Sequence, residues 1–348
     1  AYEIPLRLVG SEICIRDREI APELENIPEQ KLGAKNALYI YPWEKAGTLT
    51  EEAAEELKLC ADTIVTGAQM DAHAGLPALG ITDAGKVLLV VGTSTGIIFQ
   101  GKSRKEIQGL CSIADYCDLP ELIGYAAGQA STGDCLEWFI KNSVPGYCQE
   151  QAREAGKDIF SWLSEQAEKL KPGQNGLLAL DWWNGNRCLL GNNRLSGLMM
   201  GMTLHTSRAD IYRTLMESIA FGQRMIRDQY EMHGLSVGRV ILCGGIAAKS
   251  PLMCQIMADV LGMPVEISST NQATALGAGM CAAAGLGIKE GGYACLEDAV
   301  RHMSSNASKT VYPDKTQTAK YDAIMKNYRR LHDFFGVEEV QLMENLHI

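Results

Sequence analysis

The hydrophobic pattern first indicates a pair of strands. Residues 86–92, KVLLVVG, are apolar on both faces, as expected for a strand that is covered on both sides. The segment GTST leads from this run into a second apolar run at residues 96–100. Together the two runs predict a β-hairpin whose tip is rich in glycine and hydroxyl groups.

Residues 38–75 predict shorter elements. LYIYPWEKAG, residues 38–47, predicts an extended piece that is ended by Pro42. TEEAAEELKLC begins with the Glu-rich first turn typical of a helix, and a strand is predicted at residues 62–66. The next stretch, TGAQMDAHAG, is taken as extended, which would place Asp71 and His73 on one face.

Strands and helices alternate in the rest of the chain. Residues 150–170 carry apolar side chains at helical spacing before a stop at Lys-Pro-Gly, and residues 177–185 predict a strand that leads into a loop. Ser207 and Asp210 have capping-box spacing and predict the start of a helix. A last helix within residues 318–335 is predicted to end with Gly336 as its cap.

The most regular unit spans residues 239–285. It predicts a strand at 239–243, a Gly-Gly turn, a helix at about 250–262, a strand at 264–268 and a helix of small residues at 273–285. Because strand, helix and strand follow one another, the fold class is α/β.

Composition narrows the class of protein. The chain has 348 residues, 46% of them hydrophobic, and no apolar run reaches the length of a membrane span, so a cytoplasmic protein without a membrane partner is expected. A net charge of −10 argues against nucleic acid as a partner. The eleven cysteines form no CxxC pair, which favours reduced thiols over disulfides or a metal site.

Two glycine-containing turns are candidate phosphate or nucleotide sites. Gly92, Thr93, Ser94 and Thr95 offer backbone and hydroxyl donors to a phosphate, although an ordinary polar turn has the same composition. At residues 244–245 two glycines follow a strand, where a base or phosphate would meet no Cβ, although a tight turn also needs glycine. The turn is not the GxGxxG of a dinucleotide-binding dehydrogenase, and the early strands lack that motif too.

Asp71 is the candidate catalytic base. Phosphoryl transfer needs the γ-phosphate held in line and a carboxylate that orients and deprotonates the attacking hydroxyl, and Asp71 lies just before the predicted hairpin. A metal pair with His73 would be an incomplete site, so His73 is expected to be structural.

Five segments in order resemble the FGGY carbohydrate kinases, and most closely the ribulokinases among them. The segments are GAQMDAHAG, GTSTG, AAGQASTGDCLEWF, LDWWNGNR and the run from CGGIAAKS to GMCAA, and the resemblance covers roughly residues 55–335. It implies the actin-like, ribonuclease-H-like fold, in which two α/β domains close on a sugar and on ATP, used with Mg²⁺.

The resemblance also implies roles for particular residues. Asp71 matches the family's catalytic base, and GTST matches the hairpin that approaches the terminal phosphates. Gly133 and Glu137 match a small nucleotide-binding loop and the helix that leaves it. The turn that receives adenosine is matched by Gly244, Gly245 and Ser250.

Two departures limit the resemblance. Ribulokinases commonly carry a Glu that helps to hold the sugar where this chain has Ala126. A ketopentose such as L-ribulose is still the expected substrate, and the missing Glu leaves D-ribulose, xylulose or a polyol as the alternative. The family's opening DxGT strand has no counterpart. Residues 1–84 are therefore expected to be the tail of an N-terminal domain, with the first 20 or so unplaced, and residues 85–348 the C-terminal, nucleotide-binding domain.

The lack of a counterpart to most of the family's N-terminal domain also affects the activity that is expected. The isolated chain is expected to be an inactive part of the kinase, with a homo-oligomer as a further possibility. A non-catalytic, actin-like nucleotide-binding module is the alternative, since it would keep the hairpin and the Gly-Gly turn without needing Asp71.

Overall fold

The computed structural model describes residues 40–270, 272–305 and 307–346. The first 20 or so residues, which the family resemblance leaves unplaced, therefore lie outside the described residues.

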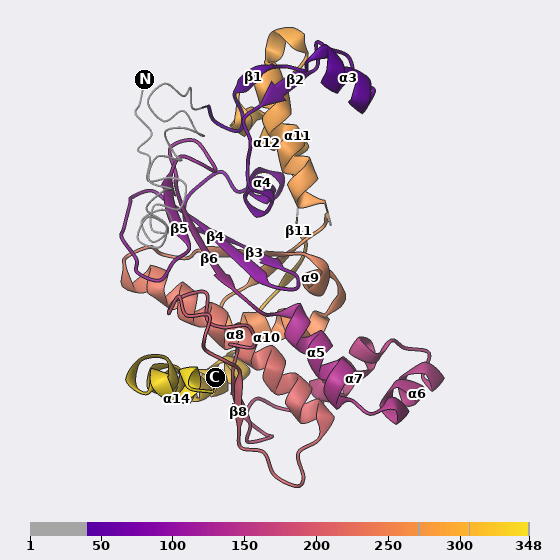
Figure 1. Ribbon diagram of the computed structural model, residues 1–348, viewed down its shortest axis with the longest axis vertical. Helices are drawn as coiled ribbons and strands as arrows, with labels where there is room; N and C mark the ends of the chain where they lie inside the picture. Colours follow the sequence, from indigo (N-terminus) through magenta and orange to yellow (C-terminus); the bar gives the residue numbers. More distant parts are fainter. Residues whose placement is uncertain (1–39, 271, 306, 347–348) are drawn as a thin grey trace.

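A mixed sheet of seven strands forms the centre of the described structure (Figure 1). The strand order is β11-β10-β9-β3-β4-β6-β5. β3, β9 and β10 are parallel to one another, and each remaining neighbour is antiparallel. The strands are β3 (Lys86–Val91), β4 (Thr95–Gly101), β5 (Ser112–Asp115), β6 (Ile123–Gln129), β9 (Arg239–Cys243), β10 (Val265–Ser268) and β11 (Ala307–Val311).

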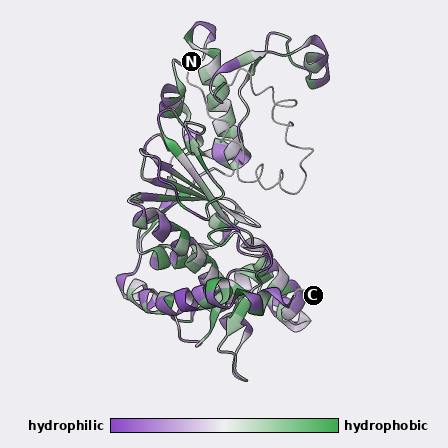
Figure 2. Cartoon of the chain, turned by 60° about the vertical axis from the view of Figure 1, so that its left-hand side comes forward, coloured by the Kyte–Doolittle hydropathy of each residue, from purple (hydrophilic) through white to green (hydrophobic). Residues whose placement is uncertain are grey.

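The predicted hairpin is confirmed as β3 and β4. Val91 pairs with Thr95 across the turn, so Thr95 is the first residue of β4 and the tip consists of residues 92–94. Strand β3 is covered on both sides as predicted, because Leu89 lies in one hydrophobic core and Leu88 in another. Figure 2 shows hydrophobic stretches on the strands and a mixture of hydrophobic and hydrophilic residues on the helices.

One face of the sheet is covered by long helices: α8 (Arg208–Met232), α10 (Pro251–Leu261) and α13 (Lys315–Asp333). The predicted start of α8 is confirmed, because Ser207 and Asp210 form a complete capping box. The predicted cap at Gly336 is wrong, since a π-helical turn continues from Phe334 to Glu338. Gly336 instead packs closely, and a Cβ there would lie 2.3 Å from Leu190 Cδ1.

The opposite face is covered by α4 (Asp71–Ala78), α11 (Ala273–Leu286) and α12 (Leu296–Met303) (Figure 1). Helices α4 and α11 touch through backbone. A Cβ on Gly277 of α11 would lie 1.6 Å from the carbonyl oxygen of Ala74 in α4. The small residues predicted at 273–285 therefore serve close helix packing here.

Shorter elements surround these layers. The extended piece predicted to end at Pro42 lies partly outside the described residues, and its residues 40–41 form no strand. A strand follows the proline instead, as β1 (Lys45–Thr48), antiparallel to β2 (Ile64–Thr66). The helix predicted over 150–170 is two helices, because Gly156 at φ +69° breaks it and Asp158 caps a new one. The other short elements are α3 (Glu51–Leu57), α5 (Gly133–Ser143), α6 (Gly146–Glu154), α7 (Ile159–Glu168), β7 (Leu178–Leu180), β8 (Leu198–Met200), α9 (Gly245–Lys249), η3 (Ile288–Glu290) and α14 (Val340–Glu344).

Candidate active site

Asp71 is the first residue of α4. The prediction of an extended segment is wrong here, because residues 71–78 are helical and side chains two apart on a helix do not share a face. The Asp71 side chain is exposed, and its Oδ1 accepts a hydrogen bond of 2.7 Å from the backbone N–H of Ala72. A carboxylate is stabilised in a first helical turn by the free N–H groups there. The candidate site thus has an accessible carboxylate on a residue whose backbone belongs to a helix.

His73 points away from that surface into a buried ion pair. Its Nδ1 lies 2.6 Å from Asp118 Oδ1, and Gln100 donates to Asp118 Oδ2 at 2.9 Å. Burial opposes the charged imidazole, but the hydrogen bond and charge of Asp118 outweigh it, so the pKa of His73 is raised. Burial likewise opposes the Asp118 carboxylate, but its hydrogen bonds outweigh this effect and lower its pKa. The pair ties the first turn of α4 to the sheet.

Small residues lie where the start of α4 meets the sheet. A Cβ on Gly96 of β4 would lie 3.8 Å from the Cβ of Ala72, so the start of α4 lies over the start of β4. Ala126 of β6 pairs directly with Ile98 of β4, and paired residues project to the same side of a sheet. Ile98 packs in the core under α4. Ala126 is therefore half-buried on the same side of the sheet as Asp71.

The hairpin tip is held by the start of α5. Backbone N–H groups of Thr132 and Gly133 donate to the carbonyl oxygens of Thr93 and Gly92, at 2.8 Å and 3.0 Å. Thr93 is exposed at the tip and Ser94 is half-buried. Thr95 is fully buried, and its hydroxyl is 2.8 Å from the hydroxyl of Thr132. Thr93 is thus the hydroxyl of this segment that faces solvent most openly.

Three predicted nucleotide-binding segments meet at this tip. A Cβ on Gly133 would lie 2.7 Å from the carbonyl oxygen of Gly92 and 2.9 Å from Ile246 Cδ1. Gly244, at φ +100°, would place a Cβ 2.5 Å from the carbonyl oxygen of Val91. The hairpin, the start of α5 and the Gly-Gly turn therefore pack against one another so closely that larger residues would separate them. A Cβ on Gly245 would meet open space.

Two further candidates lie at the edges of this cluster. Glu137 is exposed one helical turn after Gly133, on the same side of α5. Ser250 is half-buried and caps α10, since its hydroxyl oxygen accepts from the N–H of Met253 at 3.3 Å. A groove of about 600 Å³ begins at the next residue, Pro251, and three lysines contribute to its lining: Lys169, Lys171 and Lys309.

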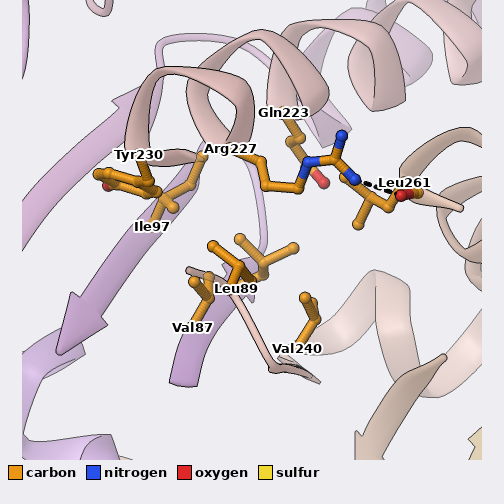
Figure 3. Close-up of a pocket in the computed structure, with 9 residues that line it drawn as sticks. Val87, Leu89, Ile97, Gln223, Arg227, Tyr230, Val240 and Leu261 are labelled. Atoms are coloured by element: carbon orange, nitrogen blue, oxygen red, sulfur yellow. Dashed lines mark hydrogen bonds between the residues drawn. The ribbon is translucent and has the colours of Figure 1, made fainter. Parts of the chain in front are cut away.

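A second cavity lies inside the core (Figure 3). It is surrounded by β3, β4 and α8 residues, among them Leu89, Gln223 and Arg227, and its volume is about 10 Å³. That volume matches a single water molecule, so this cavity has no room for a nucleotide or a sugar.

Within the described residues, no three His, Cys, Asp or Glu side chains gather as a metal site. In that same part of the chain, no helix combines the length and apolar character needed to cross a membrane.

The sequence analysis missed the partners that support these candidates. Asp118 is 45 positions from His73, and nothing in the local pattern marks it as buried. Asp134 was also missed, although it accepts from Ser131 Oγ at 2.6 Å and from the N–H of Thr132 at 3.0 Å. Its signal was available, because a Ser followed three residues later by an Asp at a helix start is a common local cap.

Known structures define the class of fold. The chain superimposes on a xylulose kinase from Rhodospirillum rubrum with a TM-score of 0.71 and 26% identity, over 86% of this chain and 57% of that one. A xylulose kinase from Lactobacillus acidophilus gives a TM-score of 0.73 at 17% identity, over 87% and 58%. The expected actin-like, ribonuclease-H-like fold of the sugar kinases is therefore confirmed.

The sequence comparisons identify the family. Residues 87–286 match the C-terminal domain of the FGGY family of carbohydrate kinases, and the chain belongs to that family. It is 38% identical to a ribulokinase of Anoxybacillus flavithermus over 94% of this chain, and 40% identical to one of Bacillus licheniformis over 90%. The predicted resemblance to ribulokinases is confirmed. The chain spans 58% and 56% of the length of these two relatives.

Proposed function

We propose that the complete protein transfers the γ-phosphoryl group of ATP to a hydroxyl of a ketopentose such as L-ribulose. The observation that carries this proposal is the close packing of the hairpin tip, the start of α5 and the Gly-Gly turn, with the helix that begins at Asp71 lying over the start of β4, next to that tip. This arrangement supports a phosphate site with a carboxylate beside it, which is what phosphoryl transfer requires.

In the proposed mechanism each segment has one task. The exposed Thr93, with Ser94, donates to the terminal phosphates. Gly92 closes the tip through its N–H bond to the carbonyl oxygen of Ser94, and Thr95 holds the hairpin through Thr132. Adenosine lies against Gly244, Gly245 and Ser250, with Gly133 and Glu137 opposite, and the open space at Gly245 leaves room for it. Asp71 orients the attacking hydroxyl and accepts its proton. Mg²⁺ enters with ATP, because substrate phosphates and water are its usual ligands.

We further propose the division into two parts that the length comparison suggests. Residues 1–84 belong to the N-terminal domain, and residues 85–348 form the C-terminal, nucleotide-binding domain. The relatives are longer, so half of the cleft comes from outside this chain. The isolated chain is therefore expected to be inactive, since closure of both domains excludes water from the reaction.

The choice of sugar depends on Ala126. It faces the same side of the sheet as Asp71 and presents only a methyl group, where ribulokinases commonly carry a carboxyl group. This favours a second candidate substrate, D-ribulose, xylulose or a polyol, whose binding does not need that carboxyl group. Ala126→Glu in the full-length enzyme is expected to shift the ratio of kcat/KM values towards L-ribulose.

The decisive experiment uses the full-length enzyme with ATP, Mg²⁺ and a panel of ketopentoses and polyols. Sugar-dependent ADP formation is expected, and Asp71→Asn is expected to lower kcat by about 10²–10⁴-fold while nucleotide affinity stays unchanged. Asp83→Asn is the control, since Asp83 is an exposed carboxylate paired with Lys86 on the surface. Near-normal turnover by Asp71→Asn would disprove the base. ATP binding without turnover for any sugar would favour the non-catalytic module.

A further inference from the structure

Two cysteine sulfurs lie in contact away from Asp71 and the hairpin tip. Cys111 Sγ and Cys188 Sγ are 3.3 Å apart, although 77 positions separate them in the chain. Cys111 is exposed just before β5, and Cys188 is buried in the segment that follows β7. The described residues contain no other cysteine pair in hydrogen-bond contact. An accessible sulfur therefore has a second sulfur directly behind it.

The backbone holds this pair in place on both sides. The N–H of Cys111 donates to the carbonyl oxygen of Ala126 at 2.9 Å. Gly109, at φ +82°, packs so closely on the other segment that a Cβ would lie 1.9 Å from the carbonyl oxygen of Leu189. A disulfide bond is about 2.05 Å long, so the sulfurs need to approach by roughly 1 Å, which side-chain rotation can supply.

The surroundings favour the reactive form of one thiol. The hydrogen bond between the two sulfurs lowers the pKa of Cys111, burial opposes this effect, and the Arg187 charge adds to it, so the pKa of Cys111 is lowered overall. Burial raises the pKa of Cys243, Cys254 and Cys281 to about 11. Because the thiolate is the nucleophile, Cys111 is the thiol best prepared for oxidation among these cysteines.

We propose that Cys111 and Cys188 form an oxidisable dithiol site that takes peroxides as its co-substrate and closes to a disulfide. The Cys111 thiol gives up its proton, and the resulting thiolate attacks one peroxide oxygen. The O–O bond breaks, Cys111 becomes a sulfenic acid, and the other oxygen leaves as hydroxide, which takes up the released proton to form water. The Cys188 sulfur then attacks the Cys111 sulfur and displaces a second water. The sum is two thiols and one hydrogen peroxide giving one disulfide and two waters. The site stands independently of the proposed phosphoryl transfer.

The disulfide would join two segments beside strand β6 of the sheet. Cys111 is bonded to Ala126, and Arg187 adjoins Cys188, with its Nη1 3.5 Å from where a Cβ on Gly128 would be. Oxidation therefore fixes the start of β5 to the segment after β7. The expected result is slower amide exchange in residues 109–112 and 186–190 of the oxidised protein than of the reduced protein.

The test treats the reduced chain, at low concentration, with a small excess of hydrogen peroxide. The expected product is monomeric, has lost two hydrogen atoms by intact mass, and yields a linked peptide containing Cys111 and Cys188 that dithiothreitol separates. Cys60→Ser is the matched control, since Cys60 is also exposed, and it is expected to form the same linked peptide at the same rate.

Two variants make the outcome decisive. Cys188→Ala is expected to leave Cys111 as a sulfenic acid that dimedone captures, and Cys111→Ser is expected to prevent the disulfide and the dimedone adduct at this site. Circular dichroism checks that both variants fold. The linked-peptide analysis of the wild-type protein tests the proposal without either variant. Oxidation of Cys60 and Cys295 with Cys111 still reduced, or a Cys111 adduct in the wild type without the linked peptide, would overturn the proposal.

Discussion

The two faces of the central sheet are built from different kinds of side chain. The face under α8, α10 and α13 is filled with large apolar and aromatic residues, and it includes a fully buried pair, Phe221 and Tyr328, with ring centroids 5.3 Å apart. The core under α4, α11 and α12 is packed with aliphatic side chains such as Leu88 and Ile98, without a buried aromatic ring among its described residues, and Gly277 brings the backbones of α11 and α4 together. Asp71 and Ala126 belong to this second face.

We infer that the first face contributes mainly to the stability of the fold and that the second face leaves backbone accessible to other groups. Large side chains fill space and remove apolar area from water, which stabilises the first face. On the second face, Gly277 and Gly96 leave backbone within reach of other groups, so this face can accept a helix or a ligand at those positions. We expect substitutions on the first face to act mainly on folding, and those on the second to act mainly on the position of α4.

The largest expected effect on stability comes from Arg213 on the first face. Its Nε donates to Glu217 at 2.8 Å and its Nη2 donates to Tyr321 at 2.9 Å, all within the core. Arg213→Met is expected to lower the free energy of unfolding by about 3–5 kcal/mol, because it leaves the Glu217 carboxylate buried without its charge partner. Urea unfolding measures the change.

The matched control is Arg301→Met on α12. Arg301 pairs with Asp298 at 3.2 Å but is largely exposed, so about 0–1 kcal/mol is expected. Equal effects of the two substitutions would contradict the assignment of the Arg213 network to the stabilising core.

The next effect belongs to the second face. Gly277→Ala inserts a methyl group that overlaps the carbonyl oxygen of Ala74, and is expected to cost about 1–3 kcal/mol and to displace α4. Gly279→Ala on the same helix meets nothing within 4 Å, and is expected to stabilise by about 0.5–1 kcal/mol through helix propensity. Urea unfolding and amide exchange in α4 measure both. Faster exchange in α4 for both variants, or for neither, would contradict this contact.

The elements that the sequence predicts best carry their own signals. Strand β9 has the predicted bounds because an apolar run ends at two glycines, and α8 begins at the predicted capping box. Helix α4 could not be predicted, since its eight residues include Gly75 and Pro77 and its main support is contact with α11. Propensity is weak there and tertiary packing decides the conformation.

The residues of the candidate site also differ in whether a local sequence signal or a tertiary contact marks them. Asp71, Thr93 and Gly133 could be proposed from the sequence because their types and order carry the family pattern, whereas Asp118 belongs to no local motif. Distant partners of this kind depend on sheet register, which one sequence does not state. Gly336 was misjudged for a related reason, because glycine is used both at helix caps and where another chain segment needs close approach.

A smaller expected effect is the pH dependence of the stability of the second face. The pKa of His73 is raised by Asp118, so its contribution to stability is complete below the unfolded value of 6.5 and disappears as pH rises through the folded value. The pKa of Asp118 is lowered, so its contribution is complete above 3.8 and disappears as pH falls through the folded value. Both contributions are complete between 3.8 and 6.5.

Asp118→Asn is therefore expected to destabilise more at pH about 5.5 than at about 9, with a difference on the order of 1 kcal/mol. Urea midpoints of both proteins at the two pH values measure it. Asp83→Asn, on the surface, should show a much smaller pH-dependent gap. A gap for Asp118→Asn that grows towards pH 9 would show that His73 is not held in its charged form.

The smallest effect concerns how the helices of the two faces begin. Ser207 caps α8 with its side chain, but Met70 at the N-cap of α4 makes no such bond and is exposed. Met70→Ser is expected to add about 0.5–1 kcal/mol, because a hydroxyl oxygen there can accept from the free N–H of the first turn. Met232→Ser, exposed at the end of α8, is the control and should change little. If Met70→Ser brings no gain, then Asp71 Oδ1, which already accepts from the N–H of Ala72, is itself the cap of α4. The residue proposed as the catalytic base would then also stabilise its own helix, so that catalysis and the stability of the second face would depend on the same side chain.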